Sequence, residues 1–365
     1  MIHLVVPRDQ DWAFVNYLTG HGASLARDMR VVHYESLPAQ RAFERGTWVF
    51  SALDQLAPGM ERLVRTVAET LAAEPGVRVF NDPRRTLLRH DLLAALADRG
   101  LNGFRVVRAG AAYEALRYPV FVRAERSHGG NISPLLHDPK EVRAWLGRAV
   151  VQGYAFADLL VAEFHDTASP EGYYRKYAAF IVGDRILPRS MAYGRSWMLK
   201  HEQTELSEAV MLEERAYLHA DPHAAQLAEI VRIAGVDYGR IDYAVLDGRV
   251  QTWEINLHPT IGRSPGRRRI PLPAELEALR KANRESFYRK FNEAWLPYAA
   301  PCEGRPIPMS LDAELIRRAA DGRRKPRSSM LALRAVARPF KPVLEPVAMQ
   351  LFPVITALAR RFKPG

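Results

Sequence analysis

Residues 239–256, GRIDYAVLDGRVQTWEIN, read as two β-strands that turn back on each other at Asp247 and Gly248. Apolar and polar residues alternate along the second strand, a period of two that gives one apolar and one polar face. The continuation, LHPTIG (257–262), ends that strand at Pro259. The hairpin therefore carries a row of polar groups, and their arrangement depends on how the two strands pair.

Two registers are open for this hairpin. A two-residue turn puts Asp242 opposite Trp253, and the acidic side chains then point to different faces. A three-residue loop over 247–249, with Gly248 in the left-handed conformation of a bulge, puts Asp242 opposite Glu254 instead. We expect the second register if the hairpin carries chemistry.

In the second register Arg240 also lies opposite Asn256, and all four polar groups share one face. Two carboxylates opposite each other lie about 5 Å apart at Cβ and repel. A hard divalent cation removes this conflict, because Mg²⁺ takes oxygen ligands, usually one or two carboxylates completed by water and phosphates. Asp242, Glu254 and the Asn256 carbonyl form such a partial shell, which Mn²⁺ would also suit, and Arg240 would meet the anionic group being transferred. On spacing alone, a solvated hairpin with scattered salt bridges is an equally good interpretation.

The composition of the 365 residues is that of a soluble globular protein with two or three domains, with 48% apolar and 25% charged residues. The single cysteine, Cys302, excludes an intramolecular disulfide and indicates a reducing compartment. The sequence has no secretory signal and no run of about 20 apolar residues that would span a membrane. We therefore expect a cytoplasmic protein.

The net charge of +11 is concentrated at the C-terminal end, since residues 301–365 hold 13 Lys and Arg against 5 Asp and Glu. The remaining body is nearly neutral, so nucleic-acid binding is not expected of it. Prolines interrupt the tail, which excludes a long helix. Three interpretations of the tail stay open: packing on the body or on a sister subunit of a homo-oligomer, peripheral attachment to an anionic membrane, and contact with nucleic acid or an acidic partner.

The first eighty residues alternate apolar strands with amphipathic segments. IHLVV (2–6), RVVHYE (30–35), TWVFSAL (47–53) and VRVF (77–80) read as strands, and MERLVRTVAETLAAE (60–74) reads as a helix. This is the βα rhythm of a parallel sheet. No GxGxxG motif follows the first strand, so a dinucleotide fingerprint is absent.

The middle of the chain mixes strands and helices without that rhythm, which is typical of an α+β unit built on antiparallel pairs. We expect one helix that is capped by Asn81 or Asp82 and ended by Gly100. A longer helical region is expected from about Leu206 to Ala234.

The hairpin motifs RID (240–242) and EINLHP (254–259) resemble the late magnesium-binding strands of the ATP-grasp superfamily, which often read R-x-D and E-x-N-x-x-P. Four earlier segments resemble, in order, the opening helix, the phosphate-binding strand with its Gly-rich loop, the adenine hinge strand and the following strand pair: NDPRRTLLRHDLLAAL (81–96), YPVFVRAERSHGG (118–130), LLVAEF (159–164) and YRKYAAFIVGDRILP (174–188). The resemblance covers about residues 80–265.

The resemblance implies a fold class of α/β plus α+β in four parts. An N-terminal Rossmann-like (pre-ATP-grasp) domain precedes a two-lobed ATP-grasp module and a basic C-terminal tail. The implied ranges are 1–80 for the first domain, 81–157 for the small lobe, 158–300 for the large lobe with the Mg-ATP site, and 301–365 for the tail.

The resemblance also implies contacts with ATP phosphates. Arg123 would contact these phosphates, where lysine is commoner, and would act with Arg240 in catalysis. The loop from Ser127 to Asn131 would cover the phosphates with backbone N–H groups, and Gly129 and Gly130 would allow close approach.

The implied adenine site lies at the hinge strand, with Glu163 at the amino or ribose edge of the nucleotide. Four side chains would wall the adenine: Leu160, Val161, Ala162 and Phe164. In the same resemblance Asp242, Glu254 and Asn256 are the Mg²⁺ ligands.

The sequence departs from the superfamily pattern at two places. The opening helix, which usually supplies a lysine, offers Arg89 as the second phosphate contact. Ala178 stands where many relatives carry a basic residue, and Arg175 or Lys176 would substitute, with Lys176 taken as the ATP-binding residue.

Three further residues have two interpretations each. Arg189 and Lys200 would suit a substrate carboxylate, although a solvated charge is the plainer interpretation. His258 lies on the face where it would meet a substrate, but a loop histidine that makes one backbone bond is equally consistent with the sequence.

The resemblance implies an ATP-dependent carboxylate–amine ligase that forms an amide or peptide bond through an acyl phosphate, with ATP and Mg²⁺ and with small-molecule or peptide substrates. Two alternatives stay open: an ATP-grasp phosphotransferase that stops at a phosphorylated product, and a nucleotide-binding scaffold whose catalysis has lapsed. The sequence names neither the carboxylate nor the amine.

Overall fold

The structure is a computed structural model that describes residues 1–127, 130–199, 204–262 and 272–321. Predictions about Gly129, Lys200 and the tail beyond residue 321 lie outside the described residues. The chain divides into two compact units. Unit 1 takes Met1–Leu87 and Thr167–Arg323, and the described part of unit 2 is Leu88–Asp166.

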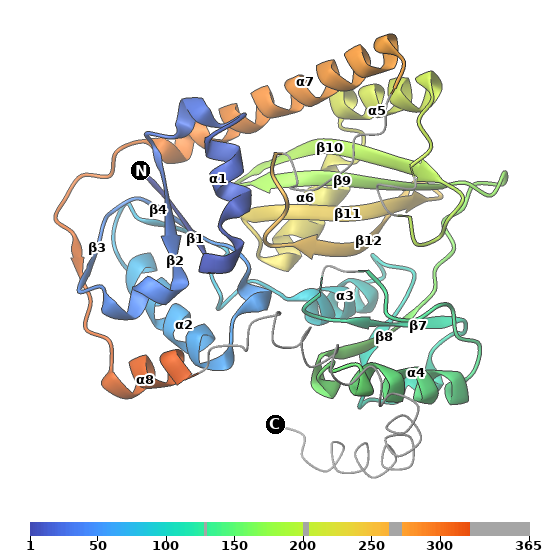
Figure 1. Ribbon diagram of the computed structural model, residues 1–365, viewed down its shortest axis with the longest axis horizontal. Coiled ribbons are helices and arrows are strands. Elements are labelled where there is room, and N and C mark those ends of the chain that lie inside the picture. The colour runs from blue at the N-terminus through green and yellow to red at the C-terminus, as the bar shows by residue number, and fades with distance from the viewer. Residues whose placement is uncertain (128–129, 200–203, 263–271, 322–365) are drawn as a thin grey trace. The chain divides into compact units, whose positions relative to one another are not determined.

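Unit 1 begins with a parallel four-stranded sheet in the order β2-β1-β4-β5 (Figure 1). Its strands confirm the four predicted from the sequence: β1 (Ile2–Val6), β2 (Met29–His33), β4 (Thr47–Phe50) and β5 (Arg78–Phe80). The helices of this part are α1 (Trp12–Leu18) and the predicted amphipathic helix α2 (Pro58–Ala72). Every residue of β1 is buried, as expected of a strand in a covered parallel sheet.

The described beginning of the tail folds onto this part of unit 1. Strand β13 (Ile307–Pro308) pairs with β3 (Ala42–Phe43), and helix α8 (Ala313–Asp321) packs on α2. The two helices approach so closely that a Cβ built on Gly59 would overlap the main chain of Arg318. Packing on the body is therefore confirmed up to residue 321, and the membrane, partner and oligomer interpretations stay predictions.

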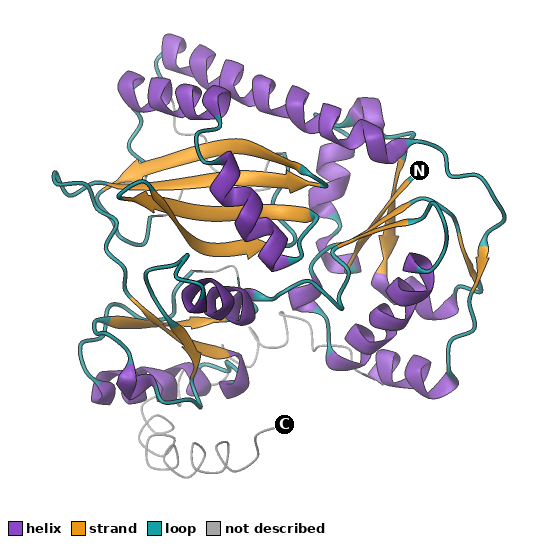
Figure 2. Cartoon of the chain, turned by 180° about the vertical axis from the view of Figure 1, so that it is seen from behind, coloured by secondary structure: helices purple, strands orange, loops and turns teal. Residues whose placement is uncertain are grey.

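The second sheet of unit 1 is antiparallel, in the order β10-β9-β11-β12. Its strands are β9 (Tyr174–Val182), β10 (Arg185–Gly194), β11 (Tyr238–Leu246) and β12 (Arg249–Asn256). Helix α6 lies across one face of this sheet, and α5 and α7 run along its β10 edge (Figures 1 and 2). The bounds of these helices are Glu208–Ala220 for α5, Ala224–Ala234 for α6 and Ala274–Ala299 for α7.

The helical region predicted from about Leu206 to Ala234 is confirmed, and it consists of two helices, α5 and α6. Helix α5 ends at Asp221, whose φ of 45° is left-handed, and Pro222 follows. A proline lacks the N–H that would continue the helix and disfavours the helical region for the residue before it. The chain therefore turns here and starts again as α6.

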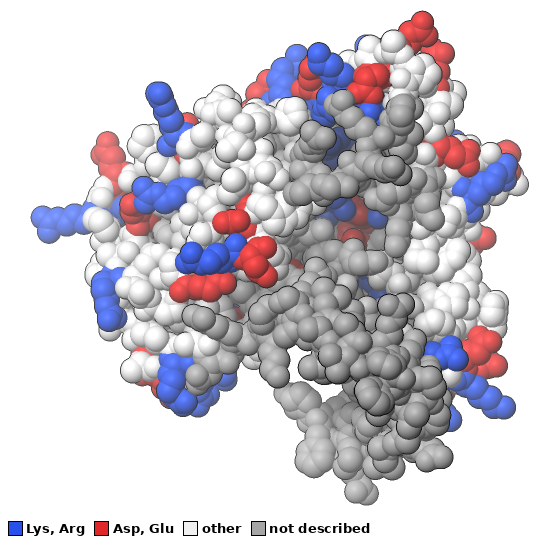
Figure 3. Space-filling view, viewed as in Figure 1, with Lys and Arg blue, Asp and Glu red and all other residues white. Residues whose placement is uncertain are grey.

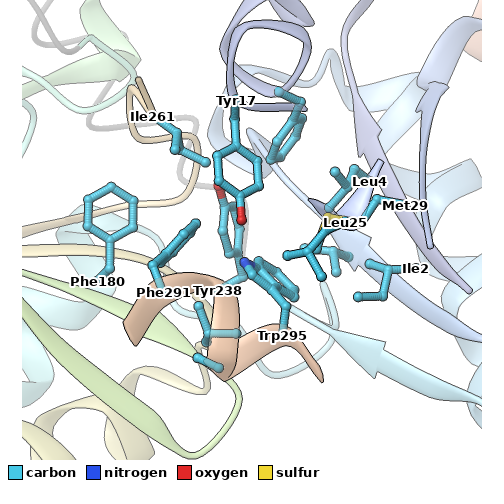
Figure 4. Packing of buried hydrophobic residues seen from close by; sticks show 14 of the residues in the cluster. Ile2, Leu4, Tyr17, Leu25, Met29, Phe180, Tyr238, Ile261, Phe291 and Trp295 are labelled. Carbon is cyan, nitrogen blue, oxygen red and sulfur yellow. The ribbon is translucent and has the colours of Figure 1, made fainter. Parts of the chain in front are cut away.

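One hydrophobic core joins the two sheets of unit 1. In Figure 4, Ile2, Leu4 and Met29 come from the parallel sheet and Phe180 from the antiparallel sheet, with aromatic side chains between them. Those central side chains are fully or almost fully buried: Tyr17, Tyr238, Phe291 and Trp295. The antiparallel sheet and the N-terminal sheet are therefore parts of one cooperative body.

Unit 2 contains an antiparallel sheet in the order β6-β8-β7. Its elements are α3 (Arg89–Asp98), β6 (Val106–Arg108), β7 (Val120–Ala124), α4 (Pro139–Val151) and β8 (Leu159–Glu163). Helix α4 starts at a strong cap, since the Asp138 carboxylate accepts from the N–H groups of Lys140 and Glu141. The helix predicted to be capped by Asn81 or Asp82 begins only at Arg89, and Gly100 (φ 66°) follows its end as predicted.

The described residues are thus a mixed α/β protein with one parallel and two larger antiparallel sheets, which confirms the coarse fold class. The Rossmann-like character of the first part and the four-part division stay predictions. Short 3₁₀ helices complete the described elements: Arg8–Gln10, Ala23–Leu25, Tyr34–Ala39, Leu53–Gln55, Tyr113–Ala115 and Phe156–Asp158.

Among the described helices, none combines the length and the apolar character needed to cross a bilayer. Basic and acidic side chains are interspersed over the described part of the face in Figure 3, in line with the nearly neutral body.

Candidate active site

The β11–β12 hairpin turns in two residues, so the predicted three-residue loop from Asp247 to Arg249 is wrong. Leu246 pairs with Arg249, and Asp247 and Gly248 have φ of 51° and 74°. Positive φ at both central positions is the type I′ geometry that matches the twist of a hairpin.

The predicted facing pairs are nevertheless confirmed, because the extra residue lies further along the strand. Tyr243 pairs with Thr252, but Asp242 pairs with Glu254, so Trp253 is the bulged residue. The bulge shifts the register by one and returns both acids to one face. Arg240 also pairs with Asn256, as predicted. The predicted pairing of Asp242 with Glu254 is therefore correct, but a bulge at Trp253 produces it and not the predicted three-residue loop.

Asp242 is the centre of an ion-pair cluster on this face. Only 2% of its side chain is exposed. Its Oδ1 and Oδ2 accept from Nε and Nη2 of Arg240 at 2.7 and 3.1 Å, and Lys176 Nζ lies 2.7 Å from Oδ2. Lys176 stands two residues before Ala178, which is paired with Asp242, so it projects from the same face of β9. It therefore supplies the cation that Ala178 lacks, whereas Arg175 pairs with Glu213 at 2.7 Å.

The electrostatics of the cluster keep Asp242 ionised. Burial by itself raises the pKa of Asp242, but Arg240 and Lys176 outweigh it and hold that pKa below its usual range, against an opposing effect of Glu254. The same carboxylates raise the pKa of Arg240 against the effect of its burial. Two carboxylates and two cations therefore balance one another on one sheet face.

Glu254 and Asn256 complete the polar row on β12. Glu254 is half-buried, and Asn256 is 7% exposed with its Oδ1 accepting from the N–H of His258 at 2.8 Å. The described residues include no cluster of three or more His, Cys, Asp or Glu side chains suited to a metal. A divalent ion would therefore take at most two carboxylates and the Asn256 carbonyl from this row, which is the donor set Mg²⁺ accepts when phosphates and water fill the rest.

His258 fastens the end of β12 to the carboxyl ends of β1 and β4. Its Nδ1 lies 2.7 Å from Ser51 Oγ, and its Nε2 lies 2.9 Å from the carbonyl oxygen of Gln10. A carbonyl oxygen only accepts, so Nε2 carries the proton and, in the neutral ring, Nδ1 accepts from the Ser51 hydroxyl. The ring also packs edge-on against Phe14. His258 thus makes more than the single backbone bond that the sequence suggested.

In unit 2, Arg89 holds the loop that follows β7. Its Nη1 donates to the carbonyl oxygens of Ala124, Glu125 and Ser127 at 2.8, 2.7 and 3.0 Å, and the side chain is buried. This guanidinium fixes the start of the predicted phosphate loop from within the unit. A direct contact of Arg89 with ATP stays a prediction.

Arg123 lies on β7 opposite Leu160 of β8 and is 8% exposed. Arg123 also forms an isolated antiparallel bridge with Asn131, which ends the predicted phosphate loop. Both ends of that loop are therefore attached to β7. Gly130 has a φ of 92°, which favours glycine. The ATP contacts of Arg123, Ser127 and Gly130 stay predictions.

The Glu163 carboxylate is a structural clamp within unit 2. It accepts from the main-chain N–H groups of Arg105 and Arg117 at 3.0 and 2.7 Å and from Arg105 Nε at 3.0 Å. Burial tends to raise the pKa of Glu163, but these hydrogen bonds lower it below the usual range. No pattern in the sequence indicates these partners, because they lie 58 and 46 residues away from Glu163.

The neighbours of Glu163 divide between core and hinge. Val161 is fully buried in the hydrophobic cluster between the sheet and α4, which assigns its side chain to the core. Phe164 donates its N–H to the Pro119 carbonyl at 2.9 Å and is half-buried. The adenine contacts of Val161, Glu163 and Phe164 stay predictions.

The sequence matches no protein-family model and no curated protein. Three solved structures illustrate what the fold is similar to. The ATP complex of D-alanine–D-alanine ligase from Bacillus anthracis is 12% identical with a TM-score of 0.45, covering 82% of this chain and 96% of that one. A RimK domain ATP-grasp protein from Sphaerobacter thermophilus is 15% identical with a TM-score of 0.41, covering 80% and 100%. The ATP-grasp ligase PsnB, in complex with a precursor variant, Mg and ADP, is 14% identical with a TM-score of 0.42, covering 77% and 97%.

Because every TM-score is below 0.5, the functional reasoning below is built on the residues of the site alone.

Proposed function

We propose that this protein is an ATP-dependent ligase that joins a carboxylate to an amine, using Mg²⁺ and an acyl phosphate. One observation carries the proposal. On a single face of the antiparallel sheet, Asp242 pairs with Glu254 across the strands and is bonded by both Arg240 and Lys176.

The donor set fits a divalent cation. The carboxylate of Asp242 is kept ionised although it is almost fully buried, and Glu254 faces it directly. Mg²⁺ held by Asp242, Glu254 and Asn256 would neutralise charge on the phosphates of ATP. If a cation took their place on the two carboxylates, Arg240 and Lys176 would be free to meet the oxygens of the transferred phosphoryl group.

The proposed reaction needs no nucleophile from the protein. A carboxylate oxygen of the acid substrate attacks the γ-phosphorus of ATP, the bond from this phosphorus to the β-phosphate oxygen breaks, and ADP leaves. The amine nitrogen then attacks the acyl carbon, inorganic phosphate leaves with the bridging oxygen, and the amine gives a proton to solvent. The protein contributes positioning and charge neutralisation, which are the main sources of rate in phosphoryl transfer.

The first experiment measures release of ADP by the full chain with Mg-ATP and mixtures of amino acids and carboxylic acids. Asp242→Asn and Glu254→Gln should each lower the rate by about 100-fold or more, because each removes one of the two facing charges. Asp247→Asn is the matched control, since it makes the same chemical change at the turn of the same hairpin. Unchanged ADP release in both site variants would show the assignment to be wrong.

A second measurement separates a ligase from a phosphotransferase. With an acid labelled by ¹⁸O in its carboxylate, a ligase transfers one label to inorganic phosphate, and mass spectrometry detects an amide of acid and amine. A phosphotransferase instead leaves a stable phosphorylated product and releases no labelled phosphate. Absence of any ADP release, with intact folding, would favour the lapsed scaffold.

A further inference from the structure

A second group of basic side chains lies in unit 1, away from the Asp242 cluster, and we name it the basic cluster: His21 after α1, Arg189 of β10 and Arg284 of α7. Tyr288 forms its floor. The His21 and Tyr288 rings are stacked with centroids 3.8 Å apart and 10° between their planes, and the Arg189 guanidinium lies 5.7 Å from the Tyr288 centroid. Arg284 precedes Tyr288 by one turn of α7, on the same side of the helix.

A β-bulge gives Arg189 its direction. The pairing of β10 with β9 shifts between Pro188 and Ser190, so Arg189 is the extra residue. Bulges re-aim a side chain and are common near active sites. The Arg189 guanidinium consequently leaves the regular strand pattern and lies over the ring of Phe287 at 4.7 Å.

The basic cluster shares a sheet face with Asp242. Phe180 pairs directly with Arg240, and directly opposed residues carry their side chains on one face. The Phe180 ring lies 5.4 Å from Phe287, on which Arg189 rests. Two strand spacings separate β10 from β11, so the backbone at Arg189 lies about 10 Å from the backbone at Asp242.

Hydrogen bonds hold the parts of the cluster in place. Asn292 of α7 donates to the carbonyl oxygen of His21 at 2.8 Å and accepts from the Tyr17 hydroxyl at 2.6 Å. The Tyr288 hydroxyl accepts from the N–H of Gly262 at 2.7 Å, which ties the cluster to the segment after β12. The His21 backbone and the Tyr288 ring are therefore held in place by hydrogen bonds, although the His21 side chain is itself exposed.

Within the described residues no carboxylate forms an ion pair with the cluster. Glu214, a half-buried acid that feels the charge of Arg189, accepts instead from a main-chain N–H of β10 and from an asparagine amide of α7, at 3.1 and 3.2 Å. Glu285 lies 3.8 Å from a lysine one turn away. Burial lowers the pKa of His21, and the positive charges of Arg284 and Arg189 lower it further, against an opposing effect of Glu285. The cluster is thus a positively charged site with an aromatic floor.

We propose that the basic cluster binds a second carboxylate of the acid substrate, so that the ligase proposed above acts on a diacid. Two planar guanidinium groups suit a carboxylate, which they bind through paired N–H donors. The rings of Phe287 and Tyr288 suit the methylene chain between the two acid groups. The separation of about 10 Å from the Asp242 strand matches a substrate with several bonds between its carboxyl groups.

The test measures binding by calorimetry to the full chain without nucleotide. The probes are pimelate, a seven-carbon diacid, its monoamide, and inorganic phosphate. We expect the wild type to bind pimelate at least 10-fold more tightly than the monoamide, and the double variant Arg189→Gln, Arg284→Gln to lose this difference. Arg280→Gln is the control, because Arg280 lies one turn away and pairs with Glu277; it should bind like the wild type. Melting temperatures confirm that each variant is folded.

Equal binding of pimelate by the wild type and the double variant would overturn the inference, as would no binding by the wild type or tighter binding of phosphate than of pimelate. The inference rests on the proposed function, but the two fail separately. Pimelate binding without any ADP release contradicts only the proposed function, whereas ADP release that depends on Asp242, without pimelate binding, contradicts only the diacid.

Discussion

Asn81 follows β5 with a φ of 54°, is fully buried, and joins the parallel sheet to the first residues of β11. Its Nδ2 donates to the carbonyl oxygens of Phe50 and Tyr238 at 3.1 and 2.7 Å. Its Oδ1 accepts from the N–H groups of Asp237 and Tyr238, both at 2.9 Å. One side chain therefore satisfies four main-chain groups, one on Phe50 and three on Asp237 and Tyr238.

The expected loss in Asn81→Ala has two parts. Each hydrogen bond contributes about 1 kcal/mol to the free energy of unfolding, or about 4 kcal/mol for the four. The left-handed conformation, which asparagine tolerates, costs alanine about 1 kcal/mol more. We expect Asn81→Ala to lower the free energy of unfolding of unit 1 by about 5 kcal/mol, and Asn81→Gly by about 4 kcal/mol, because glycine accepts the positive φ.

The assay is urea unfolding followed by tryptophan fluorescence, since Trp48 and Trp295 are both buried in unit 1. Because the chain has two units, the transition of unit 1 is fitted separately from that of unit 2. A loss below about 2 kcal/mol in both variants would refute the reasoning, because fewer than half of the four bonds would then contribute. A larger loss in glycine than in alanine would refute the backbone part.

Three further predictions concern Glu214 and Gly239 of unit 1 and Glu163 of unit 2. Burial raises the pKa of Glu214, so the folded state holds the carboxyl proton more tightly than the unfolded chain does. Relative to Glu214→Gln, the wild type should therefore lose stability in urea titrations as the pH rises from about 4 through the raised pKa. Parallel pH profiles of the two proteins would contradict this. Glu163→Gln leaves an arginine and two main-chain N–H groups with a weaker acceptor, and it should lower the free energy of unfolding of unit 2 by about 2 kcal/mol. This loss is smaller than for a fully buried ion pair, because the arginine is half exposed. An unchanged melting temperature would exclude the structural role of Glu163. In Gly239→Ala the new Cβ would lie 2.9 Å from a main-chain oxygen of β12, so we expect the free energy of unfolding to fall by about 1–3 kcal/mol and Mg-ATP binding to weaken. The control Gly110→Ala should be tolerated, because the nearest atom to its new Cβ lies 3.8 Å away. Similar melting temperatures for the two variants would contradict the clash at Gly239.

The sequence by itself determined the parts of the fold that depend on local patterns. Alternation of apolar and polar residues located the strands, and the position of Asp247 and Gly248 located the hairpin turn. The spacing of Asp242 and Glu254 left two registers open, and the acids face each other in one of them, as they do in the structure. These features depend on period, turn chemistry and capping, which are written in neighbouring residues.

The tertiary structure decided the parts that depend on partners distant in sequence. We expected the irregularity of this hairpin in its turn, and only the pairing of β11 with β12 locates it as a bulge at Trp253. Lys176 was one of two candidates until the pairing of β9 with β11 brought its Nζ to Asp242. Asn81 reads as a helix cap but bonds to main chain 156 and 157 residues away.

The distance in sequence between partners also distinguishes the Asp242 row from the basic cluster. The Asp242 row lies on adjacent strands of one hairpin, so its residue types and spacing were visible in the sequence. The basic cluster takes His21, Arg189 and Arg284 from three distant segments, and only the packing of α1 and α7 against the sheet brings them to one aromatic floor. Local chemistry is specified by short-range sequence patterns, whereas a site gathered from separate elements exists only once the hydrophobic core has set the position of those elements.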